Sequence, residues 1–170
     1  MARILFFISI LLMSCSDSKP KQDDRLTHER IIKSHLLAFV DSCWNKKDMN
    51  SLKKLTTQNF VRNLNGIQVA SNQSEMEGQL NVFFKAFPDG LMHIDKVYVQ
   101  DNSSFHYWSY TGTNTDIFGE TPTTGKKINV SGFSVIHYAE DGKMIQEDTY
   151  YNELGLLQQL GYSLIAPVLE

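Results

Sequence analysis

The sequence predicts an α+β domain in which helices cover one face of a curved antiparallel sheet. Residues 25–87 carry apolar side chains mainly at three-and-four spacing, which is typical of amphipathic helices. Residues 91–151 alternate with a period of two between short turn signals, which is typical of consecutive antiparallel strands. Helices followed by a run of strands favour a layer of helices packed on one sheet. A length of 170 residues suits a single domain of this kind.

The first half of the chain divides into three predicted helices and one hairpin. The first helix is long and amphipathic, and the second is short and capped by Asp48. Two β-like runs flank a glycine and predict the hairpin. In the third helix, Asn72 with Glu75 three residues later resembles a capping box. The elements predicted here are the helices 25–48, 48–55 and 72–87 and the strands 60–64 and 67–71.

The second half predicts four strands and a closing helix. The turn signals "DNSS", "GETPTTG" and "EDG" separate the strands, and these short connections favour antiparallel pairing. Asn152 stands where the closing helix begins, so a helix N-cap is its simplest role. The predicted strands are 91–101, 103–116, 126–140 and 143–151, followed by the helix 152–161.

The N-terminus predicts a lipoprotein leader. "MARILFFISILLMSC" has one early arginine, an apolar run and a closing "LMSC", which resembles a bacterial lipobox with Cys15 as the lipidated residue. We therefore expect a signal peptide over 1–14, a flexible tether over 15–24 and one domain over 25–170. The protein is then exported and held by its lipid to a bacterial membrane, on the periplasmic side or at the cell surface. Cys43 lies on an apolar helical stripe and is interpreted as a core thiol.

Composition and motifs disfavour several classes of function. The net charge is −3 and no basic stripe occurs, so nucleic acid is not expected as a partner. The five histidines do not form a metal-ligand spacing, and there is no glycine-rich phosphate loop, so neither a metal nor a cofactor is expected.

Alternation in two strands defines candidate pocket residues. His106, Trp108, Tyr110 and Asn114 share one face of their strand, a mixture of aromatic and polar groups that is common in small-ligand sites, although such rings can also simply fill a core. In the last strand, Asp148, Tyr150 and Asn152 form one set, whereas Glu147, Thr149 and Tyr151 form the other. Solvated charges at the edge of the sheet are the simplest interpretation of Glu147, Asp148 and Glu153.

Five pieces of the sequence together resemble the SnoaL-like polyketide (ester) cyclase family of the nuclear transport factor 2-like fold. The resemblance spans about residues 36–161 and implies a cone-shaped sheet wrapped by helices around a ligand cavity. It also implies cofactor-free ring closure by an aldol step, carried by an acidic residue and histidines. The pieces are "WNKKDMNSLKKL", "NFVRN", "FKAFPDG", "YTGTNTDIFGETPTTGKKI" and "EDGKMIQEDTYYNELGLLQQLG".

The chain departs from this family pattern at its acid and base positions. Asn152 stands where the pattern has an acid, Thr149 where it often has a tryptophan, and Asn63 and Asn114 where it has histidines. Amides donate and accept hydrogen bonds but do not take up protons at neutral pH. The predicted catalytic residues are therefore Asp148 and His106, and the predicted ligand-binding residues are Asn63, Trp108, Tyr110, Asn114, Phe133, Tyr150 and Asn152.

Three functions remain open from the sequence. The first is a lipoprotein that binds a small apolar, aromatic or polyketide-like ligand without cyclase chemistry. The second is a cofactor-free cyclase, isomerase or hydratase with relocated acid and base residues. The third is a protein-interaction module that uses the open face of the sheet, a face through which a homodimer is also conceivable.

Overall fold

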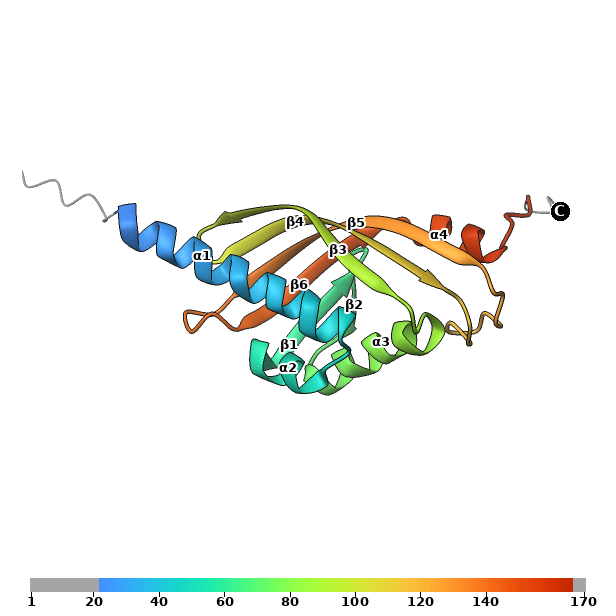
Figure 1. Cartoon of the computed structure of the whole chain (residues 1–170), viewed down its shortest axis with the longest axis horizontal. Coiled ribbons are helices and arrows are strands. Elements are labelled where there is room, and N and C mark those ends of the chain that lie inside the picture. The colour runs from blue at the N-terminus through green and yellow to red at the C-terminus, as the bar shows by residue number, and fades with distance from the viewer. Residues whose placement is uncertain (1–21, 167–170) are drawn as a thin grey trace, which may run out of the picture.

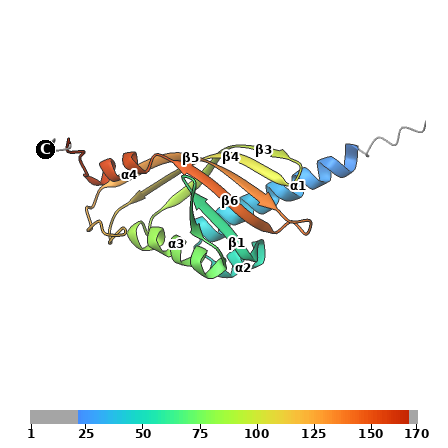
Figure 2. The ribbon, with the colours of Figure 1, turned by 180° about the vertical axis from the view of Figure 1, so that it is seen from behind.

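The computed structural model describes residues 22–166, which form one curved sheet with helices packed against it. Helices α1, α2 and α3 lie on the concave side of the sheet, and α4 lies at the end of the molecule opposite the start of α1 (Figures 1 and 2). The elements are α1 (Gln22–Ala38), η1 (Phe39–Asn45), α2 (Met49–Leu55), β1 (Thr56–Leu64), β2 (Ile67–Ala70), α3 (Gln73–Ala86), β3 (Leu91–Gln100), β4 (Ser103–Thr113), β5 (Lys127–Tyr138), β6 (Met144–Tyr151) and α4 (Glu153–Leu160).

The long first helix is confirmed but is not one uniform α-helix. Helix α1 begins at Gln22, three residues before the predicted start, and passes at Phe39 into the π-helical segment η1. Lys47 has a φ of 58° and ends the helical region. The predicted signal peptide, Cys15 and most of the predicted tether lie outside the described residues. Within the described part of the chain, no helix combines the length and apolar character needed to cross a membrane.

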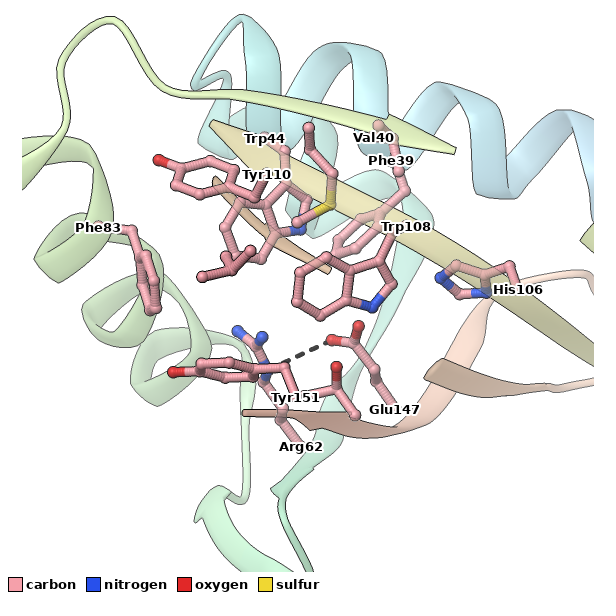
Figure 3. Close-up of a pocket in the computed structure, with 13 residues that line it drawn as sticks. Phe39, Val40, Trp44, Arg62, Phe83, His106, Trp108, Tyr110, Glu147 and Tyr151 are labelled. Carbon is pink, nitrogen blue, oxygen red and sulfur yellow. Dashed lines mark ion pairs between the residues drawn. The ribbon is translucent and has the colours of Figure 1, made fainter. Parts of the chain in front are cut away.

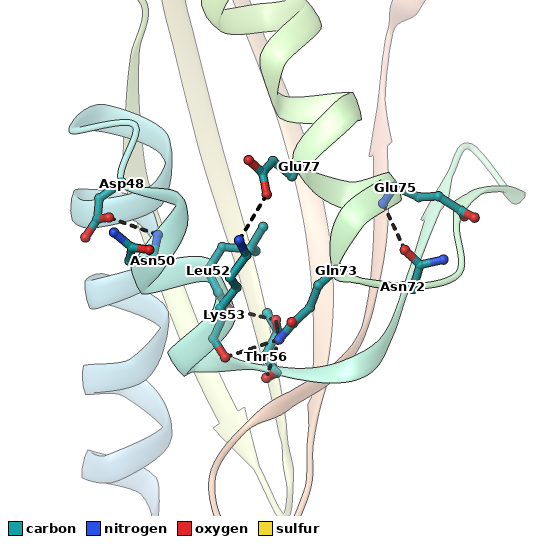
Figure 4. Close-up of polar contacts among 9 residues, drawn as sticks. All are labelled: Asp48, Asn50, Leu52, Lys53, Thr56, Asn72, Gln73, Glu75 and Glu77. Atoms are coloured by element: carbon teal, nitrogen blue, oxygen red, sulfur yellow. Dashed lines mark hydrogen bonds and ion pairs between the residues drawn. The ribbon is translucent and has the colours of Figure 1, made fainter.

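The two following helices begin at the predicted caps, as Figure 4 shows. The carboxylate of Asp48 accepts a hydrogen bond from Asn50 N at 2.9 Å, and Asn72 Oδ1 accepts one from Glu75 N at 3.0 Å. These side chains satisfy backbone donors that lack a partner in the first turn of a helix. Gln73 Nε2 donates to the backbone oxygen of Thr56 at 3.1 Å and so joins the start of α3 to the end of α2.

The sheet has the strand order β2-β1-β6-β5-β4-β3. The hairpin β1–β2 is confirmed and turns at Asn65 and Gly66, whose φ angles of 50° and 83° suit an asparagine–glycine turn. Strands β3 to β6 pair antiparallel in chain order, as predicted. Strand β1 pairs parallel with β6, so the first and last long strands become neighbours. This pair brings Arg62 next to Glu147.

The core lies between the concave face of the sheet and the helices. It includes Ile32, Leu36, Phe39 and Cys43 from the first helical region, all at most 1% exposed. Burial, followed by the charge of Asp48, raises the pKa of the Cys43 thiol to about 12, so the thiol stays protonated. Cys43 is therefore a buried core residue, as its position on the apolar stripe indicated.

Candidate functional site

A largely enclosed cavity lies inside the cone, between the concave face of the sheet, η1 and α3 (Figure 3). The cavity volume is about 20 Å³, so the cavity is a narrow slot. Three lining side chains, Phe83, Met92 and Tyr151, are partly exposed and form its rim. The lining residues are Phe39, Val40, Trp44, Arg62, Phe83, Met92, His106, Trp108, Tyr110, Val130, Glu147, Thr149 and Tyr151.

The π-helical turn places the aromatic wall that faces the sheet. In a π-helix, residues five apart lie above one another, so Phe39 and Trp44 point to the same side and both line the cavity. Trp44 meets the rings of Phe83 and Tyr110 edge-on, with ring centroids 5.9 Å apart in each case. Such edge contacts are favourable for aromatic pairs and fix the position of the indole.

The opposite wall is set by Trp108, which lies across Gly132 of the neighbouring strand. A Cβ atom on Gly132 would be 2.2 Å from Trp108 Cζ2, so only glycine leaves room for the indole here. Trp108 Nε1 donates to Ser134 Oγ at 2.9 Å, and Ser134 Oγ donates to Thr149 Oγ1 at 2.7 Å. These two hydrogen bonds hold the indole in place. Because the Thr149 oxygen accepts from Ser134, the Thr149 O–H group points away from Ser134.

A buried ion pair forms the polar part of the cavity. Arg62 Nε lies 3.4 Å from Glu147 Oε2, and the side chains are 8% and 6% exposed. The guanidinium also lies over the Trp44 ring at 5.4 Å and donates from Nη1 to Met76 Sδ at 3.8 Å. Although they face one another, Arg62 Nε and Glu147 Oε2 do not form a hydrogen bond. Two charged groups have thus lost their water without gaining the close contact that normally offsets that loss.

Four buried side-chain polar atoms in the described part of the chain lack a hydrogen-bond partner, and all four belong to residues of this cavity. They are Arg62 Nε, His106 Nδ1, Tyr110 Oη and Glu147 Oε2. Burial lowers the pKa of His106 to about 4, so its imidazole is neutral at pH 7. Burial likewise raises the pKa of Tyr110, which keeps its hydroxyl protonated. Buried polar groups normally have partners, so Arg62 Nε and Glu147 Oε2, which face each other, mark a place for a bound molecule or water. The Tyr110 hydroxyl lies instead against Gly90.

Three of the predicted site residues line this cavity. His106, Trp108 and Tyr110 are buried on the concave face of β4, as their alternation indicated. Their neighbours in the cavity include Arg62 and Glu147, neither of which was predicted as a site residue. The interpretation of Glu147 as a solvated charge is wrong, because its residue is only 4% exposed.

Asp148 and Asn63 lie away from the cavity, on the convex face of the sheet. Asn63 Nδ2 donates to Asp148 Oδ1 at 2.6 Å, and Gln146 Nε2 donates to Asp148 Oδ2 at 2.8 Å. His137 Nε2 is 3.7 Å from the same carboxylate. Asp148, predicted as a catalytic residue, is therefore part of a polar network outside the cavity, and Asn63 belongs to the same network.

A register shift in β6 explains which set of residues faces inward. The pairing with β5 shifts between Tyr138–Met144 and His137–Gln146, so Ile145 is an extra residue. Met144 is fully buried before the shift, and Glu147 and Thr149 are buried after it. Strict alternation from Met144 would instead have turned Asp148 and Tyr150 inward.

Phe133 and Tyr150 also face outward. They oppose each other across β5 and β6, and Phe133 contacts Tyr107 with ring centroids 5.1 Å apart. Tyr107 and Tyr150 are about half exposed. The expectation that Phe133 and Tyr150 line the cavity is therefore not met, since they belong to an aromatic patch on the convex face.

Asn114 and Asn152 hold the backbone in place and do not line the cavity. Asn114 is fully buried; its Nδ2 donates to Asp116 O at 2.7 Å, and its Oδ1 accepts from Thr124 N at 2.8 Å. These bonds organise the loop between β4 and β5. Asn152 Oδ1 accepts from Gly155 N at 2.8 Å, so Asn152 is the N-cap of α4. Its simplest sequence interpretation is confirmed.

Sequence reasoning missed most of the polar cavity for a clear reason. Arg62 interrupts the apolar run "FVRNL", but only its pairing with β6 gives it Glu147 as a neighbour.

The described residues contain no group of three or more side chains that could hold a metal ion. The chemistry available in the cavity is therefore that of one carboxylate, one guanidinium, a neutral imidazole and hydroxyl groups.

Comparisons with known proteins agree with the predicted fold and family. The family model of the SnoaL-like polyketide cyclases matches residues 34–160. No curated protein sequence matches the chain.

Solved structures resemble the chain over most of its length. A protein from Jannaschia sp. CCS1 named for the SnoaL-like polyketide cyclases has a TM-score of 0.73 and 17% identity, covering 80% of this chain and 95% of its own. AclR from Streptomyces galilaeus has a TM-score of 0.71 and 21% identity, covering 82% and 86%. A SnoaL-like polyketide cyclase from Agrobacterium tumefaciens C58 has a TM-score of 0.63 and 18% identity, covering 76% and 98%. At these identities the structures confirm the α+β cone fold, and the family model covers most of the sequence. The chain therefore belongs to the SnoaL-like polyketide cyclase family.

Proposed function

We propose that this protein binds a small, largely apolar or aromatic ligand in the cavity of the cone. The observation that supports the proposal is that two unpartnered buried polar atoms, Arg62 Nε and Glu147 Oε2, face each other in one aromatic-lined slot. Ligand pockets typically combine apolar walls with a few directed polar groups, and this slot has that composition. Because the slot is narrow, entry of a ligand requires the rim side chains Phe83, Met92 and Tyr151 to move.

The family resemblance implies an acid at the position of Asn152, and we propose that the asparagine there favours binding over cyclase chemistry. Asn152 is occupied as a helix cap and is exposed at the end of β6. An amide in that position neither takes up nor releases a proton at neutral pH.

Ligand capture tests this function directly. The purified protein is denatured and the released small molecules are identified by mass spectrometry, alongside a Trp108→Ala variant prepared in the same way. A compound enriched with the wild type and depleted in the variant supports the proposal. If no compound is enriched and no panel of aromatic ligands changes the fluorescence of Trp44 and Trp108, the binding function is refuted.

A second candidate is a cofactor-free cyclase, isomerase or hydratase, because the cavity contains a carboxylate of its own. Glu147 could remove a proton next to a carbonyl group, and the Arg62 guanidinium could stabilise the negative charge that develops on the oxygen. Turnover by this route should be abolished in Glu147→Gln. It should be retained in Glu140→Gln, which makes the same change at an exposed turn residue. Equal activity of the two variants would exclude Glu147 as the base.

We further propose that Cys15 carries a lipid that holds the protein to a membrane. The apolar run followed by "LMSC" supports this, and acyl chains contribute about 0.8 kcal/mol for each buried methylene. The Cys15→Ala variant is expected in the soluble fraction, and the wild type in the membrane fraction. Unchanged fractionation of the variant would argue against lipidation.

A further inference from the structure

The charge of the cavity is balanced before any ligand enters. Among the described residues that line it, Arg62 and Glu147 carry opposite charges, and the buried imidazole of His106 is neutral at pH 7. An anionic ligand therefore finds no uncompensated positive charge. It would also lose its water and lie beside the carboxylate of Glu147, which repels it.

The hydrogen-bonding capacity of the Arg62–Glu147 pair is, in contrast, largely unused. The Arg62 side chain has five N–H donors, and within the described part of the chain its one hydrogen bond is the long contact to Met76 Sδ. Glu147 Oε2 accepts no hydrogen bond. A free donor and a free acceptor thus lie 3.4 Å apart in a cavity that two indoles line, and the Arg62 guanidinium lies over the ring of one of them, Trp44.

We propose that the cavity selects uncharged ligands whose polar end carries an acceptor and a donor side by side, as in a carboxamide or a cyclic amide, and discriminates against carboxylates. This inference rests on the proposed binding function and names the chemical class of ligand. The ligand carbonyl oxygen accepts from Arg62 Nε, and the ligand N–H donates to Glu147 Oε2. The rings of Trp44, Trp108 and Tyr151 provide apolar walls for a planar body once the rim side chains have moved.

Three probes of nearly equal shape test the selection: trans-cinnamamide, methyl trans-cinnamate and trans-cinnamate. They present an acceptor with a donor, an acceptor alone, and a charged acceptor. Trp44 and Trp108 are the two tryptophans of the chain and both line the cavity, so their fluorescence reports binding there. The titration uses the full chain in detergent with empty micelles as a blank.

The expected order of affinity for the wild type is amide, then ester, then carboxylate. We expect the amide to bind at least about tenfold more tightly than the carboxylate, since an unpaired buried charge is costly. Equal or tighter binding of cinnamate overturns the inference while leaving the binding function intact. No response to any of the three probes by the folded protein counts against the binding function itself and therefore also against the inference.

The Glu147→Gln variant tests the cause of the selection. Removing the carboxylate leaves the charge of Arg62 unbalanced, so cinnamate should now bind more tightly than cinnamamide. The control is Glu140→Gln, which removes one exposed carboxylate and should keep the wild-type order. An unchanged preference in folded Glu147→Gln refutes the electrostatic origin. If this variant does not fold, the order of the three probes on the wild type still decides the proposal.

Discussion

The buried pair Arg62–Glu147 gives a prediction whose size follows from its geometry. At 3.4 Å and an effective dielectric constant of about 20, the attraction between the charges is about 5 kcal/mol. The loss of water costs several kcal/mol for each ion, so the net contribution of the pair to stability is close to zero or unfavourable. Removing one partner is different, because the remaining charge stays buried without compensation.

We expect each single replacement, Glu147→Leu or Arg62→Met, to lower the free energy of unfolding by about 3–5 kcal/mol. The double replacement should restore the stability to within about 1 kcal/mol of the wild type or raise it above that value. Methionine at position 62 can still contact the Trp44 ring through its sulfur, which limits the loss of packing.

Urea unfolding followed by tryptophan fluorescence gives the free energy of unfolding of the wild type, the two single variants and the double variant, since Trp44 and Trp108 are both buried. Thermal unfolding gives a second measure, with a shift of about 2–4 °C in Tm for each kcal/mol in a protein of this size. A double variant that loses as much stability as the two single variants together would refute the reasoning. The pair would then be a net stabilising element of the core and not a site prepared for a ligand.

Three further predictions concern His106, the packing of Trp108 on Gly132, and the N-cap of α4. The pKa of His106 is about 4 in the folded protein and 6.5 in the unfolded chain. The stability that comes from the neutral imidazole is therefore fully present above pH 6.5 and is lost, by about 3 kcal/mol, as the pH falls toward 4. Urea unfolding at several pH values should show that His106→Leu loses less stability at low pH than the wild type. Gly132→Ala should displace the Trp108 indole and destabilise the fold by about 1–3 kcal/mol, whereas Gly78→Ala on an open helix surface should stabilise it by about 0.5–1 kcal/mol in the same assay. Asn152→Ala should cost about 1 kcal/mol through the lost N-cap, while Asn152→Asp should keep the stability and, because the side chain caps α4, should not create turnover.

Local features of the fold were predictable because the residues that determine them are neighbours in the sequence. Asp48, Asn72 and Asn152 each bond to a backbone N–H two or three residues later, so a short window contains both partners. The asparagine–glycine pair Asn65–Gly66 likewise indicates its hairpin turn locally, and in the structure Asn65 also bonds to Thr149 and Tyr151 of β6.

Three of the thirteen residues that line the candidate cavity were predictable for the same reason. Alternation along β4 correctly placed His106, Trp108 and Tyr110 on one inward face. The same argument failed for β6, because one extra residue at Ile145 exchanges the two faces of the strand. Asp148 therefore turned outward and Glu147 turned inward.

The sequence by itself determined the elements, their caps and the family resemblance, since these depend on spacing along the chain. The tertiary structure alone decided the chemistry of the cavity. Arg62 and Glu147 are far apart in sequence and meet only because β1 and β6 pair in parallel, a long-range contact that no local pattern encodes. That pairing buries two opposite charges among aromatic rings, and the free hydrogen-bonding groups it leaves define what the cavity can bind.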